Sequence, residues 1–190
     1  DGRLAFVVGD VAGKGAPAGL YAGLASGIIR TRARRKYPPG QMLELVNKTI
    51  ASRPIESQYC ALMYAIYDPQ TRRICLANSG LPYPLLIHGN SPRFLELAGI
   101  PVGLFPDSQY QELDLPLESG DVLVFYSDGL VEARDASNED FGLKRLSSIV
   151  NANSGKTAEE IVNAVNSEVE DFVGRIPFHD DRTLIVARIR

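Results

Sequence analysis

The stretch Leu4–Gly15, with the sequence LAFVVGDVAGKG, decides the fold of this chain. Its apolar run ends at Gly9 and Asp10 and predicts a buried strand, and the glycines that follow predict a turn into a helix near Ala16. Asp is a poor strand former and is costly to bury without a partner. Asp10 therefore needs a cation or a set of hydrogen-bond donors at the end of this strand.

Acidic residues stand at two other strand ends. Asp128 follows the apolar run 122–127, and Asp180 and Asp181 precede the apolar run 183–186. Each is weak evidence alone, because Ser-Asp-Gly is usually a turn and the Asp pair could equally cap a loop. Together with Asp10 they predict one metal site. Oxygen ligands without thiolates or several imidazoles select Mg²⁺ or Mn²⁺, and two such ions can clamp an in-line displacement at phosphorus.

Length and composition limit the class of protein. With 190 residues and 45% hydrophobic content, we expect a single domain over residues 1–190. The formal net charge of −3 does not favour nucleic acid or an anionic membrane surface. The sequence has neither a signal peptide nor an apolar run of about 18 residues, so we predict no membrane span.

The two cysteines fall on consecutive predicted strands. We expect Cys60 to face Ser79 and Cys75 to face Tyr64, which separates the sulfur atoms by about 13 Å at ~3.3 Å per residue. No disulfide is expected, and a cytoplasmic location follows from the redox preference of free thiols. The chain opens on the turn signal Asp1–Arg3, so we interpret it as a domain cut from a longer signalling protein without its first strand.

The periodicity predicts two helix pairs separated by strands. The expected helices are 16–36, 41–52, 138–150 and 157–173. The expected strands, besides the first, are 58–67, 72–77, 84–87, 93–97, 110–115, 122–127 and 182–190. This segregation favours an α+β fold with largely antiparallel sheets.

The first of these helices has two adjacent apolar stripes. One stripe contains Leu20, Leu24 and Ile28, and the other contains Tyr21, Ala25 and Ile29. Gly19, Gly23 and Gly27 repeat every four residues, and each costs about 1 kcal/mol relative to Ala inside a helix. We expect this glycine face to pack closely against a sheet or another helix.

Three motifs resemble those of one enzyme family. They are Gly9–Gly15 (GDVAGKG), Tyr126–Glu132 (YSDGLVE) and His179–Leu184 (HDDRTL), in this order and at these separations. The chain resembles the metal-dependent PPM (PP2C-type) serine/threonine phosphatases along its whole length, and more closely their bacterial SpoIIE/RsbU-like branch. One difference is Leu81, which stands where these proteins commonly have His.

The resemblance implies a PP2C-like αββα sandwich, with two mainly antiparallel sheets flanked by helix pairs and two Mn²⁺ or Mg²⁺ ions between the sheets. Asp10 would bridge both ions, and the backbone carbonyl of Val11 would bind one of them. Asp128 and Asp180 would hold the other ion. Asp181 is the alternative to Asp180, because the family usually has Asp-Asn at this pair.

The resemblance also implies a function. The chain would hydrolyse phosphoserine or phosphothreonine on a partner protein by attack of a metal-bound hydroxide, and the partner would be a STAS-type anti-sigma factor antagonist. An upstream sensor or regulatory domain and a homodimer are further expectations. Two alternatives remain: a catalytically weak or inactive interaction module of the same fold, and a metal-dependent phosphodiesterase or nuclease. The sequence lacks the basic, aromatic-rich surface that nucleic acid would require.

Overall fold

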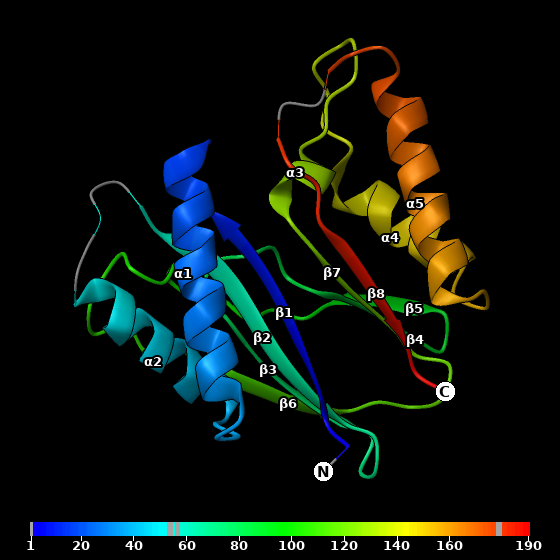
Figure 1. Cartoon of the computed structure of the whole chain (residues 1–190). Helices are drawn as coiled ribbons and strands as arrows, with labels where there is room; N and C mark the ends of the chain where they lie inside the picture. Colours follow the sequence, from blue (N-terminus) through cyan, green and yellow to red (C-terminus); the bar gives the residue numbers. More distant parts are fainter. Residues whose placement is uncertain (1, 53–54, 56–57, 178–179) are drawn as a thin grey trace. The chain divides into compact units, whose positions relative to one another are not determined.

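The computed structural model describes residues 2–52, 55, 58–177 and 180–190. The chain divides into two compact units, each with its own four-stranded sheet (Figure 1). The first unit contains Asp1–Leu81 and Leu97–Pro116, and the second contains Pro82–Glu96 and Leu117–Arg190. Each unit is described below by itself.

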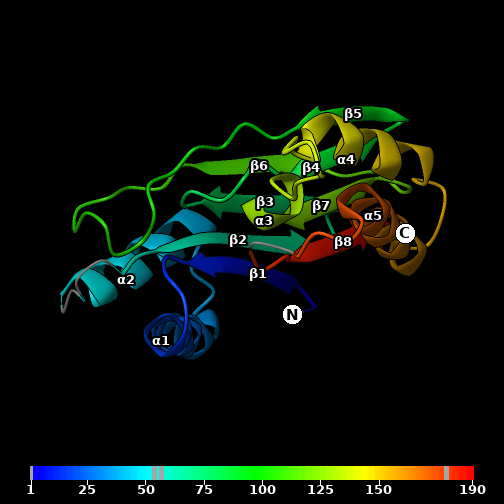
Figure 2. The same ribbon diagram turned by 90° about the horizontal axis from the view of Figure 1, so that it is seen from above.

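The first unit combines an antiparallel sheet with two helices. Its elements are β1 (Leu4–Val11), α1 (Ala16–Ala33), α2 (Pro39–Ala51), β2 (Cys60–Asp68), β3 (Arg73–Asn78) and β6 (Glu112–Pro116). The strand order is β1-β2-β3-β6, and every neighbouring pair is antiparallel. Both helices pack on one face of the sheet, where alternate residues of β2 point into the core (Figure 2). The core residues include Tyr21, Ala25, Ile29, Met42, Leu43, Val46, Ile50, Cys60, Leu62 and Tyr64.

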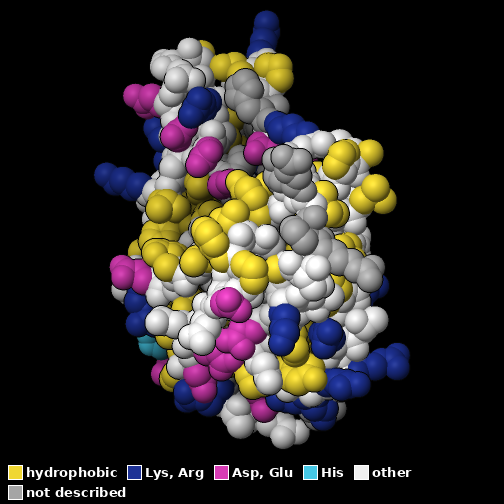
Figure 3. All heavy atoms as spheres, turned by 90° about the vertical axis from the view of Figure 1, so that its left-hand side faces the viewer, with side chains coloured by type: hydrophobic (Ala, Val, Ile, Leu, Met, Phe, Trp, Pro, Cys, Tyr) yellow, Lys and Arg dark blue, Asp and Glu magenta, His cyan; other side chains and the backbone are white. Residues whose placement is uncertain are grey.

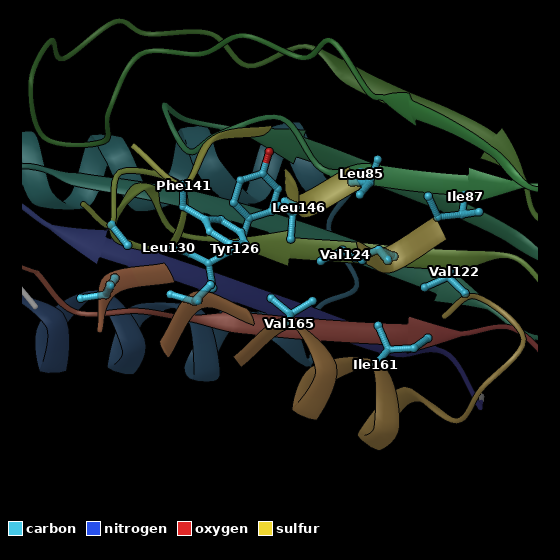
Figure 4. Close-up of a cluster of buried hydrophobic side chains, with 14 residues drawn as sticks. Leu85, Ile87, Val122, Val124, Tyr126, Leu130, Phe141, Leu146, Ile161 and Val165 are labelled. Atoms are coloured by element: carbon cyan, nitrogen blue, oxygen red, sulfur yellow. The ribbon is translucent and has the colours of Figure 1, made fainter. Parts of the chain in front are cut away.

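The second unit has the same kind of architecture. Its elements are β4 (Leu85–His88), β5 (Ser91–Phe94), β7 (Val122–Tyr126), α3 (Asp128–Val131), α4 (Gly142–Ala152), α5 (Ala158–Val173) and β8 (Leu184–Arg188). The strand order is β5-β4-β7-β8, again antiparallel throughout. Alternate residues of β7 meet α4 and α5 in a dry core (Figure 4). Its labelled members include Val122, Val124, Tyr126, Leu146, Ile161 and Val165.

The predicted elements are confirmed, with ends that shift by a few residues. The prediction that the first strand is buried is wrong, because β1 lies at the edge of its sheet and only Val8 of its eight residues is buried. The α+β class and the antiparallel sheets are as expected. The main addition is α3, a short helix at Asp128–Val131 where the sequence indicated only a turn. The helix predicted from Thr157 begins with a complete capping box: Glu160 Oε2 accepts from Thr157 N at 2.8 Å, and Thr157 Oγ1 accepts from Glu160 N at 3.3 Å.

The register predicted for the β2–β3 hairpin is wrong by two residues. Asp68 faces Arg73, so Cys75 faces Ile66 rather than Tyr64. The cause is the turn, where Asp68 Oδ1 accepts from the backbone N–H groups of the second and third residues after it, and Arg72 takes a left-handed φ of 52°. Both cysteines are nevertheless free, as predicted.

The prediction that the glycine face of α1 packs closely is also wrong. A Cβ atom built on Gly19, Gly23 or Gly27 would meet no atom within 4 Å. The buried stripe is Tyr21, Ala25 and Ile29, whereas Leu20 and Leu24 are 77% and 47% exposed. The stripe with Leu20, Leu24 and Ile28 is the more apolar of the two in the sequence, yet packing selects the one that contains Tyr21.

Among the described residues, no helix combines the length and the apolar character needed to cross a membrane.

Candidate metal centre

Asp10 and Val11 end the edge strand β1. In the antiparallel register Asp10 faces Ala61 and Val11 faces Cys60. The chain then turns, with Ala12 N donating to the Tyr59 carbonyl at 2.9 Å. The turn continues through two glycines with φ of 89° and 77°, the second of which is the N-cap of α1. The half-buried carboxylate of Asp10 is thus delivered at a fixed point where strand passes into helix.

Cys60 faces Val11 in the β1–β2 register. The protonation state of its thiol decides whether sulfur could bind a metal ion at this strand end. Burial and, to a smaller extent, the negative charge of Asp10 raise the pKa of the Cys60 thiol to about 12. Cys60 therefore stays a neutral thiol at physiological pH. Asp10 and the Val11 carbonyl leave a set of hard oxygen donors at this position, which suits Mg²⁺ or Mn²⁺ rather than a thiolate-binding metal.

Asp128 is positioned by the junction between β7 and α3. Ser127 is the N-cap residue of α3, and Asp128 Oδ1 accepts from Gly129 N at 2.8 Å. The Asp128 carbonyl accepts from Glu132 N at 2.8 Å and closes the helical turn. A strand that ends directly in a helix holds this carboxylate at one place, half-buried at the edge of the sheet.

The second acidic segment is tied to this junction by Ser127. The Ser127 hydroxyl, which is buried, accepts from Thr183 N at 2.9 Å and donates to the Asp181 carbonyl at 3.3 Å. The Ser127 backbone N–H donates to the Thr183 carbonyl at 3.1 Å. The segment before β8 therefore continues the β7–β8 pairing past the end of both strands.

Gly129 completes the approach of the two segments. A Cβ atom at this position would overlap the Asp181 carbonyl oxygen and would lie 3.3 Å from Asp180 Cβ. Only glycine lets the chain pass this closely, so the segment after Asp128 lies directly against the segment 180–181, which is distant in the sequence. Ser127 and Gly129 are typical turn residues in the sequence, so their role in linking the two segments is not predicted from it. The sequence signal for this linking role is the hydroxyl of Ser127 and the glycine at position 129, on either side of Asp128.

A pocket of about 190 Å³ opens beside Asp180. Its other lining residues are Gly129, Glu132, Ala133, Arg134, Val173 and Pro177. Arg134 also pairs with Asp140, with Nε and Oδ1 3.0 Å apart. The pocket places a second carboxylate and a guanidinium group next to one of the predicted metal ligands.

The predicted ligands are divided between the two units. Asp10 and Val11 lie in the first unit, and Asp128, Asp180 and Asp181 lie in the second. Within the described part of the chain, no three or more His, Cys, Asp or Glu side chains form a group that could hold a metal ion. The structure brings the segments that carry Asp128 and Asp180 against each other, and a metal centre formed by these residues with Asp10 stays a prediction. All these donors are oxygen atoms, as Mg²⁺ and Mn²⁺ prefer.

Leu81 occupies the position where the phosphatases that the chain resembles commonly have His. It is buried, with 6% of its surface exposed. The buried Asn78 side chain holds this turn, donating to the Leu81 and Leu97 carbonyls at 2.8 Å and accepting from Leu81 N at 3.0 Å. Leu81 is thus part of the apolar core in this chain.

Solved structures with the same fold define the class of protein. The SiaA-PP2C domain of Pseudomonas aeruginosa superimposes with a TM-score of 0.87 at 19% identity, covering 99% of this chain and 80% of that chain. RsbX in complex with magnesium has a TM-score of 0.74 at 14% identity, covering 99% of this chain and 82% of that one. The chain therefore has the α+β fold of a PP2C-type phosphatase domain.

The family follows from the sequence match. The family model of stage II sporulation protein E (SpoIIE) matches residues 1–190, so the chain belongs to the SpoIIE family. The phosphoserine phosphatase RsbU of Bacillus subtilis is 28% identical over 190 residues, which cover 96% of this chain and 55% of RsbU. The chain thus spans about half the length of RsbU.

Proposed function

We propose that this domain is a metal-dependent protein phosphatase that hydrolyses phosphoserine or phosphothreonine on a partner protein. The observation that carries the proposal is the junction in which Ser127 and Gly129 bring Asp128 and Asp180 together, in a chain that matches the SpoIIE family over residues 1–190. The similarity to RsbU, a phosphoserine phosphatase, supports the choice of reaction.

The proposed metal ligands are the carboxylates of Asp10, Asp128 and Asp180 and the backbone carbonyl of Val11. Asp180 is preferred over Asp181 because its Cβ lies against Gly129 and it lines the adjacent pocket, whereas the Asp181 backbone carbonyl accepts from Ser127. Two Mn²⁺ or Mg²⁺ ions, when bound, would make a water molecule nucleophilic and neutralise charge on the phosphoryl group. The magnesium in the RsbX structure supports this choice of ion.

The proposed substrate is a phosphorylated STAS-domain protein that acts as an anti-sigma factor antagonist. The match covers 55% of RsbU. The rest of RsbU supports a further expectation, which is that this domain works beside a sensor or regulatory domain. A cytoplasmic location is proposed from the two free thiols.

The second candidate function is a catalytically weak interaction module with the same fold. One observation favours it: the buried Leu81 stands at a position where related phosphatases commonly have a histidine. Such a module would bind a phosphoprotein and release no phosphate.

One experiment separates these candidates. Hydrolysis of p-nitrophenyl phosphate and of a phosphorylated STAS-domain protein is measured with Mn²⁺, with and without a chelator, for the wild type and Asp10→Asn. Asp171→Asn, an exposed carboxylate on α5, is the matched control. If the domain is a metal-dependent phosphatase, the wild type turns over substrate only with Mn²⁺. Asp10→Asn should lower this turnover by about 100-fold or more, because loss of a metal ligand should cost at least as much as loss of its supporting groups. Asp171→Asn should leave it unchanged.

The other outcomes assign the alternatives. Phosphoprotein binding without turnover in the wild type would support the interaction module. Cleavage of bis(p-nitrophenyl) phosphate in preference to the monoester would support a phosphodiesterase. Turnover that survives the chelator and Asp10→Asn would refute the proposed metal mechanism.

A further inference from the structure

We propose that an apolar surface made by Tyr59, Ile100, Leu104 and Phe105 docks the folded phosphoprotein substrate. This inference rests on the proposed phosphatase function and adds to it the place where the substrate polypeptide binds. All four residues belong to the first unit. The partner that this surface fits is a protein with an apolar patch beside its phosphorylated residue.

Three of the exposed large apolar side chains lie in one loop, residues 99–109. The side chains of Ile100, Leu104 and Phe105 are 44%, 45% and 57% exposed, and Tyr59 beside them is 39% exposed. Asp107 is the only charged residue between positions 99 and 109. Figure 3 shows hydrophobic side chains gathered on the side of the chain that carries α1 and α2. Apolar surface with few charges is typical of the centre of a protein interface.

The backbone of this loop is held by a buried amide. Asn47 of α2 is fully buried, and its Nδ2 donates to the Phe105 and Pro106 carbonyls at 2.8 Å and 3.0 Å. Asn47 Oδ1 accepts from Gly103 N at 2.8 Å. A Cβ atom on Gly103, whose φ is 90°, would overlap the Tyr21 hydroxyl. The fold thus uses a buried polar residue and a required glycine to fix a loop whose apolar side chains point to solvent.

A fixed loop with exposed apolar side chains suits binding. A side chain that is already ordered before association loses less conformational entropy when it docks. If the apolar residues served only the core of this unit, they would be buried as Val102 is, with no exposed surface. The arrangement instead places Leu104 and Phe105 on the outer side of a loop that Asn47 anchors from within.

The surface adjoins the proposed metal ligands of the same unit. Val102 and Cys60 exchange backbone hydrogen bonds of 3.0 Å and 2.9 Å, and Cys60 faces Val11 in the β1–β2 register. The Tyr59 carbonyl accepts from Ala12 N. A phosphoserine bound by ions that Asp10 and Val11 would hold would therefore bring its own polypeptide surface over Tyr59 and the loop, which is why the substrate is the occupant that we infer.

The test uses the double variant Leu104→Ser/Phe105→Ser. Its matched control is Leu143→Ser on α4, which removes a side chain that is also 45% exposed but lies in the other unit. Kinetics are measured with Mn²⁺ on a phosphorylated STAS-domain protein and on p-nitrophenyl phosphate. We expect KM for the phosphoprotein to rise about tenfold or more in the double variant, as loss of an interface anchor does, and both substrates to be unaffected in the control.

The kinetic outcomes decide the proposal. An equal loss of activity on p-nitrophenyl phosphate would mean that the loop supports the metal centre, and it would overturn the docking role. An unchanged KM for the phosphoprotein would overturn it as well. Size-exclusion chromatography with light scattering adds a third check, because a change of oligomeric state in the double variant would assign the surface to a second copy of the chain.

A binding measurement separates failure of this inference from failure of the proposed function. Affinity for the phosphorylated STAS-domain protein is measured with Asp10→Asn, alone and combined with the double variant, and thermal melting monitors folding. Binding that is lost only in the combined variant supports docking even if no variant hydrolyses the phosphoester. Equal binding by both proteins, or binding by neither, overturns the docking surface.

Discussion

Helices α1 and α5 have similar lengths, 18 and 16 residues, yet they are held in place by different means. α5 has a side-chain cap at Thr157, and its buried residues Ile161, Val165, Val169 and Val173 repeat every four positions. α1 has no side-chain cap, and its buried residues, Tyr21, Ala25 and Ile29, form a shorter stripe with the same spacing. Both cover a sheet of their own unit.

The solvent-facing side of α1 increases this difference between the two helices. No charged residue stands between Gly15 and Ile29, although Leu20 and Leu24 face solvent. In the described part of the chain the buried Tyr21 hydroxyl has no hydrogen-bond partner, which costs about 1–3 kcal/mol. Apolar composition alone therefore does not place a helix. α5 is located by four buried residues and a cap, whereas α1 is located by three buried residues with the same spacing, one of them aromatic, and has no side-chain cap.

The largest expected effect is on the buried stripe of α5. Ile161→Ala should lower the free energy of unfolding by about 2–5 kcal/mol, because it removes a fully buried side chain and leaves a cavity. Leu20→Ala on α1 is the matched substitution and should change stability by no more than about 0.5 kcal/mol. Urea denaturation of both variants measures the contrast. Similar losses would show that Leu20 is covered in solution and would remove the distinction between the helices.

The difference between the helices also shows what could be predicted from sequence. The spacing of Ile161 and Val165 with a Thr-x-x-Glu start sufficed for α5, because stripe and cap indicate the same face and the same first residue. For α1 the stripe that contains Leu20 is the more apolar one, yet the stripe that contains Tyr21 is buried. The choice between them depends on Gly103, which accommodates the Tyr21 ring and lies far away in sequence.

The candidate site follows the same rule. Carboxylates at strand ends identified Asp128 and Asp180 because an acidic residue beside an apolar run is locally unusual. The contacts that join the two segments depend on Ser127 and Gly129, whose residue types fit an ordinary turn equally well. Sequence reasoning therefore found the chemical groups and missed the residues that bring them together.

The next effect concerns the cap that α1 lacks. Thr157→Ala should destabilise the protein by about 0.5–2 kcal/mol, because the Thr157 hydroxyl satisfies an otherwise unpaired N–H of the first helical turn. Thr157→Ser keeps the hydroxyl and is the control. Thermal unfolding monitored by circular dichroism measures both variants. If the Ala and Ser variants melt together with the wild type, the cap does not contribute in solution.

A stabilising change is expected on α1. Gly23 lies inside the helix and has free space around it, so Gly23→Ala should raise the free energy of unfolding by about 0.5–1 kcal/mol through helix propensity. Gly129→Ala is the opposing control, because its Cβ would overlap the Asp181 carbonyl. Denaturant midpoints report both. A destabilising Gly23→Ala would mean that something packs on this glycine face, as the sequence first indicated.

The smallest effect is a pH dependence confined to the start of α5. The Thr157 backbone N–H and hydroxyl donate to Glu160 Oε2 and hold the pKa of the Glu160 carboxyl below its usual value of 4.5. A carboxyl whose pKa is lower in the folded state stabilises the fold at pH above 4.5, and this contribution is lost as the pH falls through the lowered value. Glu160→Gln removes the charge and keeps an acceptor. The wild type should thus exceed Glu160→Gln in stability at pH 7, and the two should converge below the lowered pKa.

Denaturant titrations across this range measure the difference, and Glu170→Gln, near the C-terminal end of the same helix, is the control. Since a negative charge is favourable near a helix N-terminus and unfavourable near its C-terminus, a loss of equal sign and size in both variants would show that general charge, rather than the capping box, accounts for the effect.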